Sequence, residues 1–237
     1  MKPKISIITV CFNCVHDIEG TILSVINQKY DNFEYIIVDG GSTDGTLDVI
    51  YKHIGSIDFL ISERDKGIYD AMNKGIGLAT GDWINFMNSG DSFYSNQVLD
   101  CIFSNKSVIS DYALIYGFKL YNKEYCYPFP ITFLKFGEIM ANHQCMFFNL
   151  KLVGHDFLKY NLEYLIYADF DLVNRIYIKY GKSKFFYLNE CIAVYKGGGV
   201  SSKISFQKRK DRFKILFREY GVHGLIRGLL FKLLNTI

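Results

Sequence analysis

Residues 5–50 read ISIITVCFNCVHDIEGTILSVINQKYDNFEYIIVDGGSTDGTLDVI and contain one pattern twice. A run of Ile and Val typical of a buried strand, residues 5–10, precedes apolar residues at helical spacing between positions 18 and 26. A second strand, residues 33–39, leads through the loop GGSTDG into a short second helix. Two consecutive strand–helix units favour a parallel sheet.

The alternation of strands and helices continues beyond this stretch. A third strand is predicted at residues 58–62, a helix at 68–79 and a fourth strand at 83–87. Because these strands are nearly continuous apolar runs, helices should cover both faces of the sheet, and ligands should bind where the strands end.

The pattern is less regular after residue 91. The predicted elements are a helix at 97–103, strands at 113–121 and 145–148, a helix at 168–180, and strands at 184–188 and 192–195. No Pro- or Gly-rich linker divides the chain. We therefore expect one α/β domain over residues 1–200, with a Rossmann-like, mixed but mostly parallel sheet, and a basic helical tail over residues 201–237.

The composition is that of a folded globular protein. The 237 residues are 49% hydrophobic, and the net charge of +3 favours neither a nucleic acid nor a strongly acidic partner. The N-terminus lacks the cleavage site of a signal peptide and no window of about 18 apolar residues occurs, so we expect a cytoplasmic protein without a transmembrane helix. The six cysteines are expected to be free, buried thiols, including the CxxC pair Cys11 and Cys14.

Polar residues gather just after three predicted strands, where a doubly wound sheet places its ligand site. The first cluster is VDGGSTDGT, residues 38–46, in which Asp39 leaves the strand and Asp44 is expected to cap the next helix. The second is SERDKGIYDAMNKGI, residues 62–76, and the third is NFMNSGDSF, residues 85–93. Taken alone, each cluster is also explained by capping or turn formation.

In order and spacing, the opening ISIITVCFN, then VDGGSTDGT, then KGIYDAMNKGIGLATGDWINFMNSGD resemble the family 2 glycosyltransferases of the GT-A fold. The resemblance covers residues 4–100 closely and residues 140–202 more loosely. It is strongest for the bacterial subgroup that builds surface polysaccharides of the colanic acid, O-antigen and capsule type. In that subgroup the metal motif is asparagine, any residue, glycine, aspartate, which corresponds here to Asn88–Asp91.

The resemblance implies a donor site for a nucleoside-diphosphate sugar in the first half of the chain. Thr9 would line the nucleotide pocket, and Asp39 would read the base of the nucleotide. Asp91 would ligate a Mg or Mn ion that bridges the diphosphate, a role that suits a carboxylate in a polar loop.

The same resemblance implies that the helix after the third strand contacts the donor. Many relatives carry an arginine where this chain has Met72, so Lys66 or Arg64 is expected to contact the donor phosphate instead. Asp70 and Asn73 are expected to lie in the pocket.

The catalytic base is expected in ADFDLVNRI, residues 168–176, where the family has an acidic pair opening a helix. Asp169 occupies the position of the base, and Asp171 is the alternative, although it can instead pair with Arg175 on the same helix. The implied reaction is a single displacement with inversion, in which Asp169 takes the proton of the acceptor hydroxyl and the metal stabilises the departing nucleoside diphosphate.

Two further segments are candidates for contacts with the donor. The motif NHQCMFF, residues 142–148, resembles a family position beside the donor sugar, so His143 and Gln144 are expected to bind its hydroxyls, although a lone histidine is also a common structural residue. The loop KGGGVSSK, residues 196–203, would either bring backbone amides close to a phosphate or form a flexible exit from the last strand.

Charge is divided unevenly along the chain. Residues 201–237 contain nine Lys or Arg and two acidic residues, a local +7, which leaves −4 for residues 1–200. Apolar residues recur at positions 225, 229 and 233 and at 226, 230 and 234. This basic amphipathic pattern predicts a helix in the interface of an anionic membrane. The resemblance implies a lipid-linked glycan acceptor at the inner face of the cytoplasmic membrane, which such a helix would meet. The alternative is a helix packed on the domain with a solvated basic face.

Two other functions fit parts of the sequence. A catalytically inactive, transferase-like subunit would dock on membranes through the basic tail, but it would not need Asp39, Asp91 and Asp169 together. A sugar-nucleotide pyrophosphorylase would need a glycine- and arginine-rich opening after the first strand, which is missing. The basic segment contains no recognisable motif for reading nucleic acid.

Overall fold

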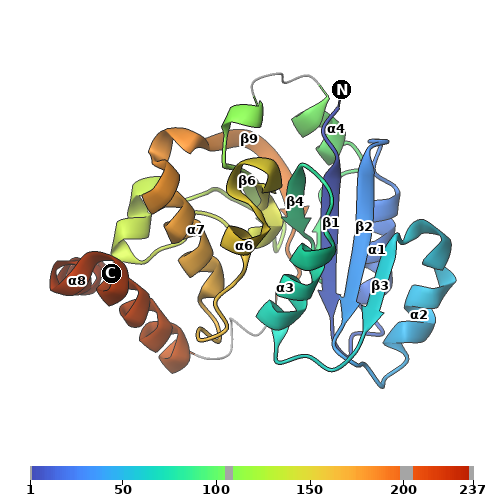
Figure 1. Cartoon of the computed structure of the whole chain (residues 1–237), viewed down its shortest axis with the longest axis horizontal. Coiled ribbons are helices and arrows are strands. Elements are labelled where there is room, and N and C mark those ends of the chain that lie inside the picture. Colours follow the sequence, from blue (N-terminus) through green and yellow to red (C-terminus); the bar gives the residue numbers. More distant parts are fainter. Residues whose placement is uncertain (1, 105–108, 198–204, 235–237) are drawn as a thin grey trace.

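The first four strands of the structure are parallel and build one side of a nine-stranded sheet (Figure 1). The structure is a computed structural model that describes residues 2–104, 109–197 and 205–234. Strand β1 (Ile5–Cys11) lies between β2 (Phe33–Asp39) and β4 (Trp83–Phe86), and β3 (Phe59–Ser62) pairs with β2. Every residue of β1 is buried, which agrees with its apolar sequence.

The remaining strands make the sheet mixed. Strand β8 (Met146–Asn149) is antiparallel to β4 and to β6 (Leu114–Tyr121), and β6 is parallel to β9 (Phe185–Val194). The short strand β5 (Ser92–Phe93) is antiparallel to β9, and β7 (Glu124–Cys126) forms a hairpin with β6. The order across the sheet is β3-β2-β1-β4-β8-β6-β9-β5. The expectation of a mixed, mostly parallel sheet is confirmed.

Helices cover both faces of the sheet, as the buried strands predict. Helices α1 (Ile18–Ile26), α2 (Thr46–Lys52) and α4 (Val98–Phe103) share a core with Ile5 and Ile7 of β1. Helices α3 (Ile68–Leu78), α5 (Leu150–Val153), α6 (His155–Leu158) and α7 (Ala168–Tyr180) pack on the other face with Ile8 and Val10. In Figure 1, α3, α6 and α7 lie in front of the sheet. Short 3₁₀ helices lie at Ile54–Ser56, Ile109–Asp111, Ile131–Phe136, His143–Cys145 and Lys182–Lys184.

The C-terminal element α8 (Ser205–Leu234) consists of two helices joined at Gly221, whose φ of 62° and ψ of −157° are not helical. In the first helix, Ile215 and Leu216 are fully buried in the core that contains α7. The second helix folds back on the first. A Cβ atom at Gly228 would lie 2.6 Å from Leu216 Cδ1, so the glycine permits this close approach.

The structure differs from the sequence prediction in several places. One strand, β9, replaces the two expected at 184–188 and 192–195, because irregular pairing with β6 lets it continue through the polar residues Asn189 and Glu190. Strands β5 and β7 contain only two and three residues, too few to show a periodic pattern. The C-terminal segment is broken at Gly221 rather than continuous. All six cysteines are free as expected, but only Cys11 and Cys145 are buried, and Cys101 is exposed.

Two expectations concern residues that are only partly described. The domain boundary expected at residue 200 and most of the glycine loop at 196–203 lie outside the described residues. The described part of the C-terminal segment packs against the domain through α8. Over the three described ranges, none of the helices combines the length and apolar character that crossing a membrane requires.

Candidate functional site

The loops that follow β1, β2 and β4 are joined by hydrogen bonds at the carboxyl-end edge of the sheet. Asn13 Oδ1 accepts from Thr43 N at 2.9 Å, and Asn13 N donates to Ser42 Oγ at 2.8 Å. Ser89 Oγ, after β4, donates to Cys14 Sγ at 3.0 Å. These bonds bring the first and third predicted clusters together, as expected for the ends of neighbouring parallel strands.

Asp39 ends β2 and is fully buried. Its carboxylate accepts hydrogen bonds from the N–H groups of Gly41 (3.1 Å) and Ser42 (3.0 Å), and from the hydroxyls of Ser42 and Ser62 (2.7 Å for Ser62). These bonds shape the turn after β2 and tie it to the end of β3. Asp39 therefore positions the loop, and its contact with a nucleotide base stays a prediction.

Thr9 lies within β1 and is fully buried. Its hydroxyl donates to Met87 O at 2.7 Å and lies 3.0 Å from Tyr35 Oη. The side chain thus joins three neighbouring strands beneath the candidate site. The expected role of Thr9 in lining a nucleotide pocket gains no support from these contacts and stays a prediction.

Asp91 follows β4 and is 6% exposed. One carboxylate oxygen accepts a hydrogen bond from Lys196 N at 3.0 Å, and the other accepts from the side-chain amide of Gln144. Burial raises the pKa of the Asp91 carboxyl above its ordinary value, and these two hydrogen bonds act in the opposite direction. Because Lys196 follows β9 and Gln144 precedes β8, three distant segments converge on this carboxylate.

His143 and Asn88 form a second polar pair beside Asp91. Asn88 Nδ2 and His143 Nε2 are 2.8 Å apart. Burial, together with the Lys119 ammonium, lowers the pKa of His143 to about 4, so its ring is neutral at pH 7 and can accept this hydrogen bond. The structure therefore brings His143 and Gln144 to the Asn88–Asp91 motif, and their expected contact with the hydroxyls of a donor sugar stays a prediction.

The same group contains oxygen atoms suited to a divalent cation. The amide oxygens of Asn88 and Gln144 are buried and have no hydrogen-bond partner among the described residues, while their NH₂ groups bind His143 and Asp91. Carboxylate and amide oxygens are ligands for Mg²⁺ and Mn²⁺. In the parts of the chain that the structure describes, no three His, Cys, Asp or Glu side chains gather to form a metal site. The donor set thus fits an ion that takes further oxygen ligands from a bound phosphate.

The second predicted cluster lies at the start of α3. Asp70 Oδ2 accepts a hydrogen bond from Lys66 N at 3.0 Å and so holds the chain that enters the helix. The Lys66 side chain is exposed, whereas Met72 is fully buried in the core. Met72 is therefore a packing residue, and the contact of Lys66 or Arg64 with a phosphate stays a prediction.

Asn73 binds the backbone of a distant segment. Its Nδ2 donates to Tyr160 O at 2.9 Å, and its Oδ1 accepts from Tyr160 N at 2.7 Å. Both ends of the amide are used in these two bonds. Asn73 thus joins α3 to the segment that leads into α7, and its expected place in the donor pocket stays a prediction.

Asp169 lies in the first turn of α7 and is partly buried. Burial raises the pKa of its carboxyl to about 6, while the Phe170 N–H (2.8 Å from Oδ1), the Lys208 ammonium and the Tyr69 hydroxyl act in the opposite direction. A carboxyl with a pKa near the working pH is suited to act as a general base. The predicted assignment of Asp169 is consistent with this environment.

Asp171, the alternative base, is fully buried. Its Oδ2 accepts from Arg175 Nε at 2.9 Å, and its Oδ1 accepts from Arg218 of α8. Both carboxylate oxygens are thus engaged by guanidinium groups, which supports an ion-pair role for Asp171. The predicted pair of Asp171 with Arg175 is confirmed.

A cavity of about 290 Å³ is lined by neighbours of both halves of the candidate site. Asn142, next to His143, lines it together with Tyr167 and Lys208, which lie near Asp169. Lys119 Nζ donates to Asn142 Oδ1 at 2.8 Å at the side of the β6–β7 hairpin. The β6–β7 hairpin, the segment before β8, the start of α7 and helix α8 therefore enclose one space.

Sequence reasoning missed the contribution of α8 to the candidate site. Asp211 is fully buried and accepts from Ile166 N at 3.1 Å, and Lys208 Nζ lies 5.5 Å from the centre of the Tyr167 ring. The available signal is the basic amphipathic pattern of residues 201–237, which predicts either a membrane-facing helix or a helix packed on the domain. The contacts show that part of this segment packs on the domain and supports the Asp169 side of the cavity.

Comparison with known proteins identifies the family. The model of glycosyl transferase family 2 matches residues 6–103. A PGL/p-HBAD biosynthesis glycosyltransferase of Mycobacterium bovis is 34% identical over 177 residues, which are 71% of this chain and 68% of that protein. The chain belongs to glycosyltransferase family 2.

Other known proteins resemble this family 2 transferase. The putative teichuronic acid biosynthesis glycosyltransferase TuaG of Bacillus subtilis is 36% identical over 100 residues, 41% of this chain and 40% of that one. The crystal structure of S. aureus TarS 1–349 matches with a TM-score of 0.71 and 14% identity, over 98% of this chain and 72% of that one. The mannosyltransferase PcManGT of Pyrobaculum calidifontis matches with a TM-score of 0.64 and 12% identity, over 100% and 76%. The family 2 transferase has the GT-A fold, as expected.

Proposed function

We propose that this family 2 transferase moves a sugar from a nucleoside-diphosphate sugar to a lipid-linked glycan acceptor, with inversion at the anomeric carbon. The Asp91 cluster contains amide oxygens that have no hydrogen-bond partner among the described residues, and Asp169 is partly buried. Sequence neighbours of both line one cavity, and this observation carries the proposal. The cluster suits a diphosphate and Asp169 suits a general base, and an inverting transfer needs both.

The donor is proposed to bind at the strand ends. A TarS structure contains UDP-GlcNAc, and the PcManGT structure contains GDP-Man and Mn²⁺, which supports a nucleotide sugar and a Mg or Mn ion here. Asp91 would hold the ion together with the amide oxygens of Asn88 and Gln144. When bound, the ion would neutralise charge that develops on the leaving diphosphate. Lys66 would contact a phosphate, and His143 would bind a sugar hydroxyl.

Asp169 is proposed to act on the acceptor. Its carboxylate takes the proton of the acceptor hydroxyl while that oxygen forms a bond to the anomeric carbon. The bond from this carbon to the phosphate oxygen breaks, and its electron pair leaves with the nucleoside diphosphate. Because the acceptor attacks the face opposite the leaving group, the configuration inverts.

The biological role is proposed from the relatives. One is named for PGL/p-HBAD biosynthesis and the other, putatively, for teichuronic acid biosynthesis. These names support a role in building a bacterial surface polysaccharide or glycolipid. A lipid carrier for the acceptor would place the reaction at the inner face of the cytoplasmic membrane.

Helix α8 is proposed to touch that membrane. Its second half carries apolar side chains that are at least 48% exposed, namely Val222, Ile226, Leu229, Leu230, Leu233 and Leu234. Lys210, Lys214 and Arg227 are exposed on the same element. An apolar surface bordered by cations suits an anionic lipid interface. Lys208 of α8 also lines the cavity, so membrane contact would bring a lipid-linked acceptor near Asp169.

Release of nucleoside diphosphate from a panel of nucleotide sugars, with a lipid-linked acceptor and Mn²⁺ or Mg²⁺, tests the proposed reaction. We expect nucleoside diphosphate to be released with at least one donor. This release should stop when a chelator removes the metal ion. Asp91→Ala should abolish ion-dependent donor binding in calorimetry, whereas Asp169→Asn should retain binding and lose turnover. Asp31→Asn, on an exposed carboxylate before β2, is the matched control.

Two results would contradict the proposal. Normal turnover in both Asp91→Ala and Asp169→Asn would remove the assigned roles. Absence of any binding of nucleotide or metal by the wild-type chain would instead favour the inactive, membrane-docking subunit.

Sedimentation with lipid vesicles tests the proposed membrane contact. We expect binding to vesicles that contain phosphatidylglycerol, weaker binding to pure phosphatidylcholine, and loss of binding when Leu230 and Leu233 are both changed to Glu. Leu162→Glu, at a residue that is 43% exposed outside α8, is the control. Equal binding of both variants would contradict the role of α8.

A further inference from the structure

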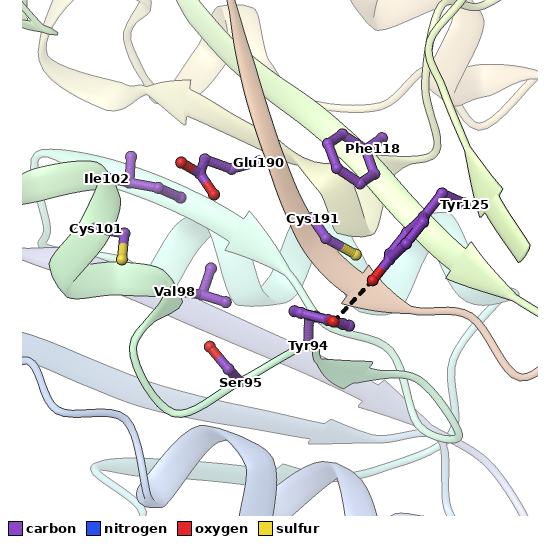
Figure 2. A pocket seen from close by; sticks show the side chains of 9 residues that line it. All are labelled: Tyr94, Ser95, Val98, Cys101, Ile102, Phe118, Tyr125, Glu190 and Cys191. Carbon is purple, nitrogen blue, oxygen red and sulfur yellow. Dashed lines mark hydrogen bonds between the residues drawn. The ribbon is translucent and has the colours of Figure 1, made fainter. Parts of the chain in front are cut away.

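A second pocket lies outside the candidate site, against the β6–β7 hairpin (Figure 2). It has a volume of about 280 Å³. The loop after β5, helix α4, the hairpin and strand β9 supply its walls. None of these lining residues belongs to the proposed reaction, so the pocket needs an explanation of its own.

Aromatic rings form one side of this pocket. The hydroxyl oxygens of Tyr94 and Tyr125 are 3.0 Å apart, and the Phe118 ring centre lies 5.6 Å from that of Tyr125. Figure 2 shows the two tyrosine hydroxyls meeting beside the pocket. Tyr94 and Tyr125 are 42% and 50% exposed, respectively. The hydroxyl contact holds the rings in place while their surfaces stay open to solvent, which is the arrangement of a stacking platform.

Glu190 contributes a negative charge on the opposite side. It lies on β9, is exposed, and in Figure 2 stands across the pocket from Tyr94. Within the described ranges of the chain, its carboxylate has no hydrogen-bond or ion-pair partner. A carboxylate has two acceptor oxygens and can bind two adjacent hydroxyl groups.

The aromatic rings and the Glu190 carboxylate together favour one class of ligand. A nucleotide or phosphate would be repelled by Glu190. The described residues offer no cluster of three His, Cys, Asp or Glu for a metal, although Cys101 and Cys191 also line the pocket. A neutral pyranose has a face of C–H groups for the rings and adjacent hydroxyls for the carboxylate. The volume of this pocket is near the lower end of the range for small-ligand sites, about 300 Å³, which suits one sugar ring.

We propose that this pocket is a second carbohydrate-binding site that takes one neutral pyranose residue. The Tyr127 ring centre lies 4.7 Å from that of Phe118, and Tyr127 lines the cavity that Tyr167 also lines. The hairpin is therefore a common wall of the two spaces. The bound pyranose belongs to the glycan acceptor, at a residue other than the one being extended, and this assignment rests on the proposed function.

Saturation-transfer NMR with methyl β-glucopyranoside, methyl β-galactopyranoside and glucuronic acid tests the proposal without requiring turnover. We expect signals from the ring C–H protons of at least one neutral sugar and weaker signals from glucuronic acid. Tyr125→Ala should weaken the affinity for the neutral sugar about fivefold, the effect of losing a contact worth ~1 kcal/mol. Glu190→Gln should raise binding of glucuronic acid relative to the neutral sugar.

Matched variants separate the pocket from the catalytic site. Tyr51→Ala removes a tyrosine that is 57% exposed on α2 and should leave the signals unchanged. Asp91→Ala should also leave them unchanged, even where it stops nucleotide release. Absence of signals for both neutral sugars, or signals that survive Tyr125→Ala and disappear in Asp91→Ala, would overturn the proposal. Sugar signals from a wild-type protein that releases no nucleoside diphosphate with any donor would refute the proposed function alone.

Discussion

The two sides of the cavity are held in place in different ways. On the Asp91 side, the carboxylate is bound by Gln144, next to β8, and by the backbone of Lys196, just after β9. On the Asp169 side, the segment around the start of α7 is bound to α8, through Asp211 to Ile166 N and through Arg218 to Asp171. One side is therefore built by strand ends and the other by contacts with the C-terminal helices.

This difference separates what the sheet determines from what tertiary contacts determine. Strands in register bring their end loops to one edge, so the position of Asp91 follows from the topology. The position of Asp169 also depends on side chains of α8, the element whose second half exposes an apolar surface. We therefore expect changes in α8 to affect Asp169, the proposed base, more than the proposed donor side around Asp91.

Removal of the Asp169 carboxylate, the proposed base, should give the largest effect. Asp169→Asn preserves shape but cannot accept a proton, so we expect kcat to fall about 1,000-fold, within the range for loss of a general base. The donor side should be unaffected, which calorimetry with the nucleotide sugar checks. A fall in donor affinity with little change in kcat would reverse the assignment of the two sides.

The stability of the same variant provides the control for folding. The Asp169 carboxyl has its pKa raised from 3.8 to about 6, so between these pH values the native state binds more protons than the unfolded state and loses stability as pH rises. Asparagine does not ionise and avoids this cost. At pH 7, Asp169→Asn should be at least as stable as wild type, with a gain of up to about 2 kcal/mol in urea unfolding.

Separation of α8 from α7 should have the next largest effect. Arg218→Met leaves the fully buried Asp171 with Arg175 as its remaining guanidinium partner. Because Arg218 is itself partly exposed, we expect a loss of ~2 kcal/mol in the free energy of unfolding, below the usual cost of breaking a fully buried pair. Urea titration measures this loss, and turnover should fall while donor affinity is unchanged.

Arg209→Met is the matched variant, because Arg209 is exposed on the same helix. It should unfold at the same urea concentration as wild type. Equal stability of the two variants would mean that α8 does not hold α7, and the contrast between the two sides would be lost.

The contrast also explains which features the sequence could predict. Alternating strands and helices place Asp39 and Asp91 after strand ends, and the four-residue spacing of Asp171 and Arg175 predicts their ion pair. Local patterns could not show that Thr9 bonds a backbone oxygen 78 positions away or that Asn73 bonds one 87 positions away. Local patterns also do not show that α8 folds back at Gly221, because this fold-back depends on the close packing of Gly228 against Leu216.

The acid limb of the pH profile should report Asp169. With a pKa of about 6, the carboxyl is ionised and active above this pH, and kcat/KM should fall about tenfold per pH unit below it. Because the Lys208 ammonium favours the ionised form, Lys208→Met should move the limb to higher pH. Lys210→Met, at another exposed lysine of α8, is the control. If the acid limb is unchanged in Lys208→Met, then Lys208 of α8 does not influence the ionisation of Asp169.

The smallest effect tests the remaining connection between the two sides. Asn73 joins α3, which follows β3, to Tyr160, which precedes α7, by two hydrogen bonds of 2.9 and 2.7 Å. Asn73→Ala leaves the N–H and C=O of Tyr160 without this partner, so we expect a loss of about 1 kcal/mol in urea unfolding. If Asn73 only positions this segment, donor affinity should be unchanged and kcat should fall slightly. A large loss of donor affinity would instead restore Asn73 to the pocket, and the donor side would then extend beyond the strand ends to α3.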